Sequence, residues 1–345
     1  MADNFGASSD YTRFNVISSR VRLARNVEGM PFPNAKMRVS DADMNAFTAG
    51  AVRAAEGLFE YGFFRMRDLG ELQKTALVER HLISPALARN SATGAVILEN
   101  TEGISVMLNE EDRVREQCVA EGFNLRLAYA RISRYDDNLC RELPVAYDDR
   151  LGFLTACPTN LGTGMRASTM LFLPALKLAG AIESALTRFV KDYGLTVRGV
   201  YGEGSEALGD MYQLSNTRTL GLTEEEILSV IERATVEMCM NESRAREKLA
   251  RKAGAQLYDK IARSYGVLTN AYMLTSAELM SLISDVKLGV ILNILPLKDT
   301  KTLDKLLVFC SAANLALQMG NASAGERDIV RAALVKRTLE GGAQR

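Results

Sequence analysis

The stretch Cys157-Pro-Thr-Asn-Leu-Gly-Thr-Gly-Met-Arg166 is the most informative part of this 345-residue sequence. It follows an apolar run, Leu151 to Thr155, that predicts a strand, and it precedes Ala167 to Tyr193, which predicts a helix interrupted at Pro174. Glycines between a strand and a helix let the backbone wrap an anion at the helix N-terminus. The stretch is neither a Walker A loop nor a dinucleotide-binding G-x-G-x-x-G. It is therefore an anion-binding loop of another kind or a structural turn.

A second segment, Ser18-Ser-Arg-Val-Arg-Leu-Ala-Arg25, concentrates cations. In a strand, Arg20 and Arg22 project to the same face because successive side chains alternate. Two guanidinium forks side by side suit a polyphosphate, whereas the alternative is a solvated edge strand.

A third segment, Asn109-Glu-Glu-Asp112, directly follows the apolar run Ile104 to Leu108 and precedes Arg113 and Arg115. Three consecutive acids at a strand end could hold Mg²⁺, orient a cation or serve as a base. The alternative is an exposed turn without a chemical role.

The fourth segment is Val197-Arg-Gly-Val-Tyr-Gly-Glu-Gly-Ser-Glu206. Its glycines let the backbone approach a ligand closely, and the alternative is a bulged hairpin turn. Together the four segments supply several arginines, two carboxylate clusters and two glycine loops. That inventory suits phosphoryl transfer, in which catalysis is mainly positioning and charge neutralisation.

Composition narrows the class of protein further. Lys and Arg total 42 and so do Asp and Glu, which argues against a general nucleic-acid or acidic-membrane binder. Thirty of the 42 cations are Arg, which hints at anion handling or at the codon bias of a GC-rich genome. The single His81 excludes a His-rich zinc site.

Several features indicate the reducing cytoplasm. The five Cys residues contain no C-x-x-C pair, so neither a disulfide framework nor a cysteine zinc site is expected. The N-terminal segment carries acids and no apolar core, unlike a signal peptide. The longest apolar stretch, Leu288 to Leu297, is far shorter than the ~20 residues of a membrane helix. We therefore expect a cytoplasmic protein that binds no membrane.

The order of predicted elements indicates an α+β domain followed by helices. Short strand-like runs mix with helices over roughly the first 220 residues. Capping boxes then open helices at Thr223-x-x-Glu226, Thr275-x-x-Glu278 and Ser323-x-x-Glu326, and two more helices are predicted over Gln256 to Tyr265 and Thr302 to Gln318. We expect a catalytic domain over residues 1–250 and an all-α domain over residues 251–345.

The four segments resemble the signature blocks of the phosphagen (guanidino) kinases, and they occur in family order across roughly residues 15 to 250. The sequence is most similar to the bacterial protein arginine kinases. The Ser-x-Arg-x-Arg block begins at Ser18 without the long helical domain of the small-molecule enzymes, and Arg198 to Glu203 reads Arg-Gly-Val-Tyr-Gly-Glu. The helical part contains Arg327-Asp-Ile-Val-Arg-Ala332, which matches that subfamily's phosphoarginine-binding motif. The resemblance implies an antiparallel sheet flanked by helices.

By resemblance, the protein transfers the γ-phosphoryl of Mg-ATP to a guanidinium nitrogen. Glu111 and Glu203 would clamp the guanidinium, which is a poor nucleophile unless carboxylates orient it and draw off proton density. Cys157 would sit beside the same group. Mg²⁺ would be held by phosphate oxygens and water, so no protein metal ligands are expected. The residues that match nucleotide-contacting positions are Ser18, Ser19, Arg20, Val21, Arg22, His81, Arg115, Arg166, Ala167, Ser168, Thr169, Met170, Arg198, Gly199, Val200, Tyr201 and Gly202.

The motif in the helical domain implies an allosteric site for phosphoarginine. Arg327 and Arg331 are four residues apart, so they share a helix face near the N-terminus capped by Ser323. Asp328 would meet the guanidinium of the ligand. The alternative is a solvated face with intrahelical ion pairs. One departure from the family is Arg113, which stands where a His is usual after the acidic block.

The expected function is therefore that of a protein arginine kinase, which marks proteins for degradation in bacterial stress and quality control. In the small-molecule enzymes, a loop of the helical domain that precedes the Ser-x-Arg-x-Arg block closes over the free guanidine. We expect a site without that loop to admit an arginine side chain that belongs to a protein. The alternatives are a kinase for free arginine and a catalytically idle adaptor that binds phosphoarginine. The resemblance also implies a Clp-type protease-chaperone machine, an activator protein and a second copy of the chain as partners, and no nucleic acid.

Overall fold

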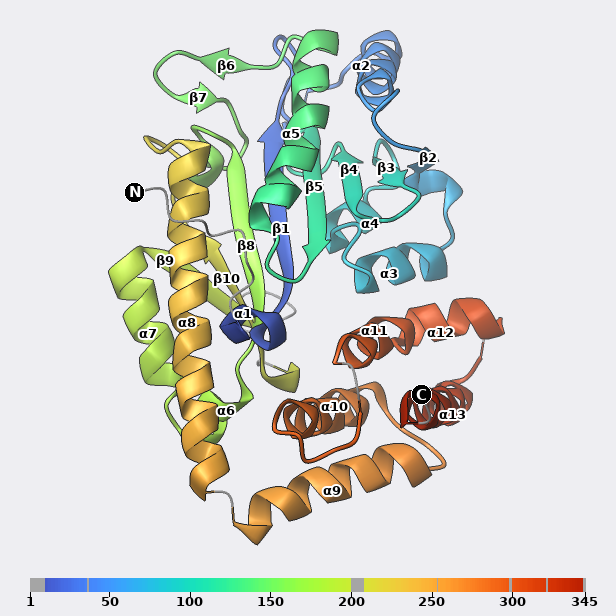
Figure 1. Cartoon of the computed structure of the whole chain (residues 1–345). Helices are drawn as coiled ribbons and strands as arrows, with labels where there is room; N and C mark the ends of the chain where they lie inside the picture. The colour runs from blue at the N-terminus through green and yellow to red at the C-terminus, as the bar shows by residue number, and fades with distance from the viewer. Residues whose placement is uncertain are drawn as a thin grey trace.

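The computed structural model describes residues 10–35, 37–199, 208–252, 254–297, 300–320 and 322–343. These residues form an antiparallel sheet with helices packed against it, followed by a group of helices (Figure 1). The expected α+β class with a helical C-terminal part is confirmed. Within these ranges, no helix is long and apolar enough to cross a membrane.

The main sheet has eight strands in the order β2-β3-β4-β5-β1-β8-β10-β9, and neighbouring strands are antiparallel. Its strands are β1 (Val16–Arg25), β2 (Tyr61–Arg65), β3 (Ala95–Glu99), β4 (Ile104–Leu108), β5 (Val114–Glu121), β8 (Met165–Phe172), β9 (Leu195–Gly199) and β10 (Met211–Asn216). A separate hairpin joins β6 (Tyr147–Asp148) to β7 (Gly152–Phe153).

The central strand β1 has two different faces. Val21 and Leu23 point into the main apolar core, which the long helices α5 (Leu125–Glu142) and α8 (Glu224–Lys252) cover (Figure 1). The alternation that buries Val21 and Leu23 turns Arg20 and Arg22 to the opposite face. The remaining helices of this part are α1 (Asp10–Asn15), α2 (Asp41–Arg53), α6 (Pro174–Leu178) and α7 (Ile182–Tyr193).

Two helices, α3 (Glu71–Glu79) and α4 (Pro85–Arg89), form a second apolar core with strands β3 and β4. Met107 of β4 belongs to this core, and it lies opposite Arg115 of β5, so both side chains project from the same face of the sheet. Helices α3 and α4 therefore stand beside the arginine face and not beside α5.

The last helices build a third core of their own. They are α9 (Ala255–Asn270), α10 (Ser276–Ile291), α11 (Lys301–Phe309), α12 (Ala312–Met319) and α13 (Ala324–Ala343). The capping boxes at Thr223 and Ser323 are both present, with the cap hydroxyl accepting from the backbone N–H of Glu226 and Glu326 respectively. The single helix predicted from Thr302 to Gln318 is wrong, because Ser311 is extended and begins a new helix, α12.

The helix predicted from Ala167 is also wrong, because the segment Met165–Phe172 is the strand β8. Its residues Met, Ala and Leu favour helices on their own, but pairing with both β1 and β10 overrides that preference. Helix begins only at Pro174. The strand predicted from Leu151 to Thr155 is reduced to the two residues of β7.

Candidate active site

The register of the sheet gathers the predicted arginines on one face. Arg22 of β1 lies directly opposite Arg166 in the neighbouring strand β8. In the other neighbouring strand, β5, Arg115 lies opposite Ala24, two residues after Arg22. Arg198 of β9 lies on the same face. It is opposite Gln213 of β10, Gln213 is opposite Met170 of β8, and Met170 is opposite Ser18 of β1. Residues directly opposite each other in antiparallel strands project to the same side. Five arginines far apart in the sequence thus share one surface.

The buried positive charges of this surface favour binding of an anion. Burial lowers the pKa of Arg20 to about 10, and the charges of Arg115 and Arg166 add to the effect. Burial and the neighbouring arginines also lower the pKa of Arg22 well below its usual value. The Nε atoms of Arg20 and Arg22 are buried without a hydrogen-bond partner in the described part of the chain. Crowded cations with unsatisfied donors suit a ligand with several negative charges.

A small pocket adjoins the arginines. It is lined by Ser18, Arg20, His81, Val119, Ser168, Met170 and Gln213. Gln213 donates from Nε2 to the Ser168 hydroxyl at 3.0 Å. Partial burial lowers the pKa of His81, and the charge of Arg20 adds to this effect. The sequence predicts Ser18, Arg20, His81, Ser168 and Met170 of this lining but not Val119 or Gln213. Gln213 is placed here only by its register with Met170.

The backbone of His81 is fixed by a hydrogen bond from the sheet. Gln117 donates from Nε2 to the His81 carbonyl oxygen at 2.7 Å. His81 has a φ of 59°, in the left-handed region that side chains other than glycine rarely adopt. Gln117 was also missed in the sequence, although it lies directly opposite Arg22.

The three acids in the turn between β4 and β5 have different surroundings. Arg115 donates from Nη1 to both oxygens of Glu110, at 2.8 and 2.6 Å. Asp112 is buried and accepts from the Asn26 amide and from the backbone N–H of Ala156, both at 2.7 Å. Glu111 is exposed and makes no hydrogen bond or ion pair with another described residue. Partial burial together with the charges of Asp112 and Glu110 raises the pKa of Glu111. Glu111 is therefore the acid of this turn that can meet a second molecule.

Arg113, which stands where the phosphagen kinases usually have a His, forms hydrogen bonds within and beside this turn. Its guanidinium donates to Asn109 Oδ1 at 2.8 Å and, from two nitrogens, to the Pro31 carbonyl at 3.1 and 2.5 Å. Asn109 itself has a φ of 60°. These contacts anchor the turn that carries the three carboxylates.

The loop from Cys157 to Gly164 lies against the acidic turn, since Ala156 donates to Asp112. Cys157 Sγ is 3.0 Å from Thr159 Oγ1. A Cβ on Gly164 would come within 2.7 Å of the Ala24 carbonyl, so this glycine serves close backbone packing. The loop leads into a strand, and the expectation of an anion at a following helix N-terminus is therefore wrong.

Four of the predicted nucleotide contacts have side chains on the other face of the sheet. Val21 is in the main core, Ala167 follows the same alternation, and the hydroxyl of Ser19 donates to the Gly122 carbonyl at 2.8 Å. Thr169 shares a 2.8 Å hydrogen bond with Thr235 of α8. Any contact of these residues with a nucleotide would come from the backbone. Other predicted residues lie outside the described residues, namely Val200, Tyr201, Gly202 and Glu203. Gly199 is the last described residue of β9.

Arg331 in the predicted phosphoarginine motif is part of the helical core. Its side chain is 1% exposed, and it donates to the backbone carbonyls of Cys310 and Leu274, both at 2.7 Å. It also pairs with Asp328. Arg327, one turn earlier, is half-buried and donates to a backbone carbonyl just before α13. Arg327 is the more accessible of the two guanidinium groups.

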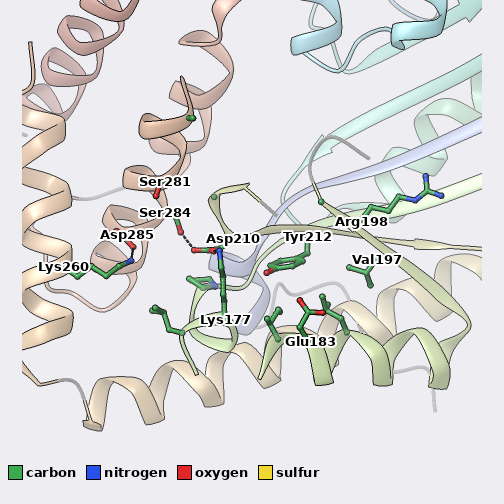
Figure 2. Close-up of a pocket in the computed structure, with 17 residues that line it drawn as sticks. Lys177, Glu183, Val197, Arg198, Asp210, Tyr212, Lys260, Ser281, Ser284 and Asp285 are labelled. Carbon is green, nitrogen blue, oxygen red and sulfur yellow. Dashed lines mark hydrogen bonds and ion pairs between the residues drawn. The ribbon is translucent and has the colours of Figure 1, made fainter. Parts of the chain in front are cut away.

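A larger cavity, of about 670 Å³, lies between α6–α7 and the helices α9–α10 (Figure 2). Its lysines are paired with acids, Lys177 with Asp210 at 2.6 Å and Lys260 with Asp285. Arg198 borders this cavity but points away from the lysines in Figure 2. Arg198 therefore lies at the border between this cavity and the arginine face. Among the described residues there is no group of three His, Cys, Asp or Glu side chains that could hold a metal ion.

Clustered arginines beside a carboxylate turn and a small pocket are features that suit phosphoryl transfer. The family model of the ATP:guanido phosphotransferase C-terminal catalytic domain matches residues 44–245, and that of the protein-arginine kinase McsB C-terminal domain matches residues 254–345. The chain belongs to the ATP:guanido phosphotransferase family.

Relatives of known name agree with this assignment. The protein-arginine kinase of Moorella thermoacetica is 44% identical over 94% of both chains. That of Caldanaerobacter subterraneus subsp. tengcongensis is 40% identical over 95% of this chain and 98% of its own. Among solved structures, the duplicated taurocyamine kinase of Schistosoma mansoni is 27% identical with a TM-score of 0.58, over 69% of this chain and 35% of that one.

Proposed function

We propose that the protein is a protein arginine kinase, which transfers the γ-phosphoryl group of ATP to the guanidinium of arginine residues in proteins. The observation that carries the proposal is the sheet face where Arg20, Arg22, Arg115 and Arg166 meet beside Glu111. The full-length similarity to proteins named protein-arginine kinase supports the choice of substrate.

The nucleotide would lie along the arginine face. The pocket around His81 and Ser168 receives the adenosine part, and the arginines neutralise the phosphates, where charge develops during transfer. Mg²⁺ that enters with ATP would supply further neutralisation of the phosphate charge. The donors left unsatisfied at Arg20 and Arg22 fit this use.

The substrate guanidinium would meet Glu111. Because Glu110 is committed to Arg115, Glu111 is available to orient the planar cation and to accept a proton as the nitrogen attacks. The raised pKa of Glu111 makes it a stronger base than an ordinary carboxylate. A nitrogen–phosphorus bond forms, the bond from the γ-phosphorus to the bridging oxygen breaks, and ADP leaves. We assign Cys157 and Glu203 to the same guanidinium by resemblance.

The start of α13 would bind phosphoarginine as an effector, with Arg327 as the entry contact. Asp328 and Arg331 are paired with each other, so binding there requires them to exchange partners. Removal of the Arg327 guanidinium in Arg327→Ala should abolish any effect of phosphoarginine on the rate while leaving the basal rate unchanged. We further propose a protease-chaperone machine of the Clp type, an activator protein and a second copy of the chain as partners, in the service of protein degradation.

Incubation with Mg-ATP, separately with an unfolded basic protein and with free L-arginine, tests the proposed function. We expect acid-labile phosphate on the protein, at arginine residues located by mass spectrometry. Transfer to free arginine alone would identify a small-molecule kinase. No transfer to either substrate would favour an adaptor that binds phosphoarginine.

A further inference from the structure

Glu79, the last residue of α3, reaches across to the helical domain. Its carboxylate accepts hydrogen bonds from the backbone N–H groups of Ala313 (2.9 Å) and Asn314 (3.1 Å), from the Ser311 hydroxyl (2.7 Å) and from the Asn314 amide (3.2 Å). These backbone groups are free donors of the first turn of α12. Glu79 thus caps a helix that begins more than 230 residues later in the chain (Figure 1).

The position of Glu79 is unfavourable within its own helix. A carboxylate at the C-terminus of α3 faces the negative end of that helix dipole, whereas the N-terminus of α12 attracts it. Ser311, the N-cap residue of α12, makes no cap of its own with its side chain. The two helix ends therefore complement each other across the interface.

Two residues after Glu79 the chain enters the nucleotide pocket. His81 lines that pocket, and its backbone is fixed on the sheet side by Gln117 and adopts the left-handed conformation. Only Arg80 separates Glu79 from His81, so at most ~3.6 Å of chain per residue lies between the contact with α12 and the pocket. The segment from Glu79 to His81 is thus clamped between α12 and β5.

We infer that Glu79 is a positioning residue for the phosphoryl-transfer reaction: through its contact with α12, the helical domain sets the place of His81 in the nucleotide pocket. The inference rests on the proposed nucleotide site. It predicts that loss of the cap weakens ATP binding more than it slows the chemical step, because His81 touches the nucleotide and not the transferred group.

The test compares Glu79→Gln with Thr275→Val. Thr275 caps α10 by accepting a 3.1 Å hydrogen bond from the backbone N–H of Glu278, so its loss weakens a helix end of the helical domain that has no hydrogen bond to Glu79. His81 is the only histidine in the chain, and its ring resonances in an NMR spectrum are therefore a direct probe. In Glu79→Gln we expect shifted His81 resonances and a KM for ATP raised about five-fold, with kcat changed by less than about two-fold. Thr275→Val should change neither.

A second variant changes Asn314 of α12, the partner of Glu79, and tests the same contact from the helical domain. Asn314→Asp places a second carboxylate against Glu79, and it should reproduce the His81 shift and the KM effect even where Glu79→Gln does not fold. Glu79→Asp, which keeps the charge, should recover part of the affinity.

Folded Glu79→Gln and Asn314→Asp proteins with unchanged His81 resonances and unchanged KM for ATP would overturn the inference and leave Glu79 as an interface contact. The NMR arm needs no turnover. A wild-type protein that transfers no phosphate would therefore count against the proposed function, whereas a shift of the His81 resonances in the two variants would still support the positioning role.

Discussion

Arginine side chains at this site are buried close to one another, where their positive charges repel. Arg22 and Arg166 lie directly opposite each other, and Arg20 and Arg115 lie close enough to lower the pKa of Arg22. Within one strand the sequence predicted that Arg20 and Arg22 share a face, because side-chain alternation is local. The other arginines join them only through the pairing of strands distant in sequence, which alternation cannot reveal.

The cost of this crowding leads to a prediction for Arg22→Met. Removal of a buried cation that other cations repel should raise the free energy of unfolding by about 1 kcal/mol while weakening ATP binding. Urea denaturation without nucleotide, together with a titration of ATP, measures both effects. A less stable Arg22→Met protein would show that the cluster is not under electrostatic strain.

The acidic turn leads to a prediction for Glu111→Gln. Loss of the base and of the guanidinium contact should lower kcat by about 10²–10⁴-fold while leaving the affinity for ATP unchanged. Initial rates of ADP release and direct ATP titration separate the two. Activity equal to that of the wild type would remove Glu111 from its role.

At the scale of elements, local signals determined helix starts better than strands. The capping boxes at Thr223 and Ser323 are short-range hydrogen-bond patterns, and both form as the sequence predicts. The sequence predicts helix where the structure has strand β8, because pairing with β1 and β10 decides the conformation of this segment. The cap that Glu79 supplies to α12 has no local signal at all.

A buried acid at a helix start leads to a prediction about pH. Glu242 of α8 accepts from the backbone N–H groups of Ala175 and Leu176 in α6, both at 2.9 Å, and burial raises its pKa from 4.5 to about 7. The folded state therefore binds this proton more tightly than the unfolded state. Its contribution to stability is complete below pH 4.5 and is lost as the pH rises through about 7, by about 3 kcal/mol in all.

Glu242→Gln keeps an acceptor for these N–H groups without a charge. The variant should lose less stability than the wild type between about pH 5 and pH 8, as measured by urea denaturation at both values. Equal losses in the two proteins would show that Glu242 does not titrate in this range.

The whole molecule joins the sheet that carries the arginine face to a group of helices, which contacts the sheet domain through Glu79. The division of the chain near residue 250 stays a prediction, with α8 ending at Lys252 and α9 beginning at Ala255. We expect brief digestion with trypsin to cut first at the exposed Arg251 or Lys252, as identified by the masses of the two fragments. A first cut inside α10 or α13 would argue against this boundary.

We propose that the arginine face and Glu111 together catalyse formation of the phosphoarginine bond on a protein. The ³¹P NMR spectrum of an unfolded protein, after incubation with the enzyme and Mg-ATP, tests it most directly. We expect a phosphorus–nitrogen signal that acid removes and that is missing with Glu111→Gln. An acid-stable phosphate ester, or the same signal with Glu111→Gln, would contradict it.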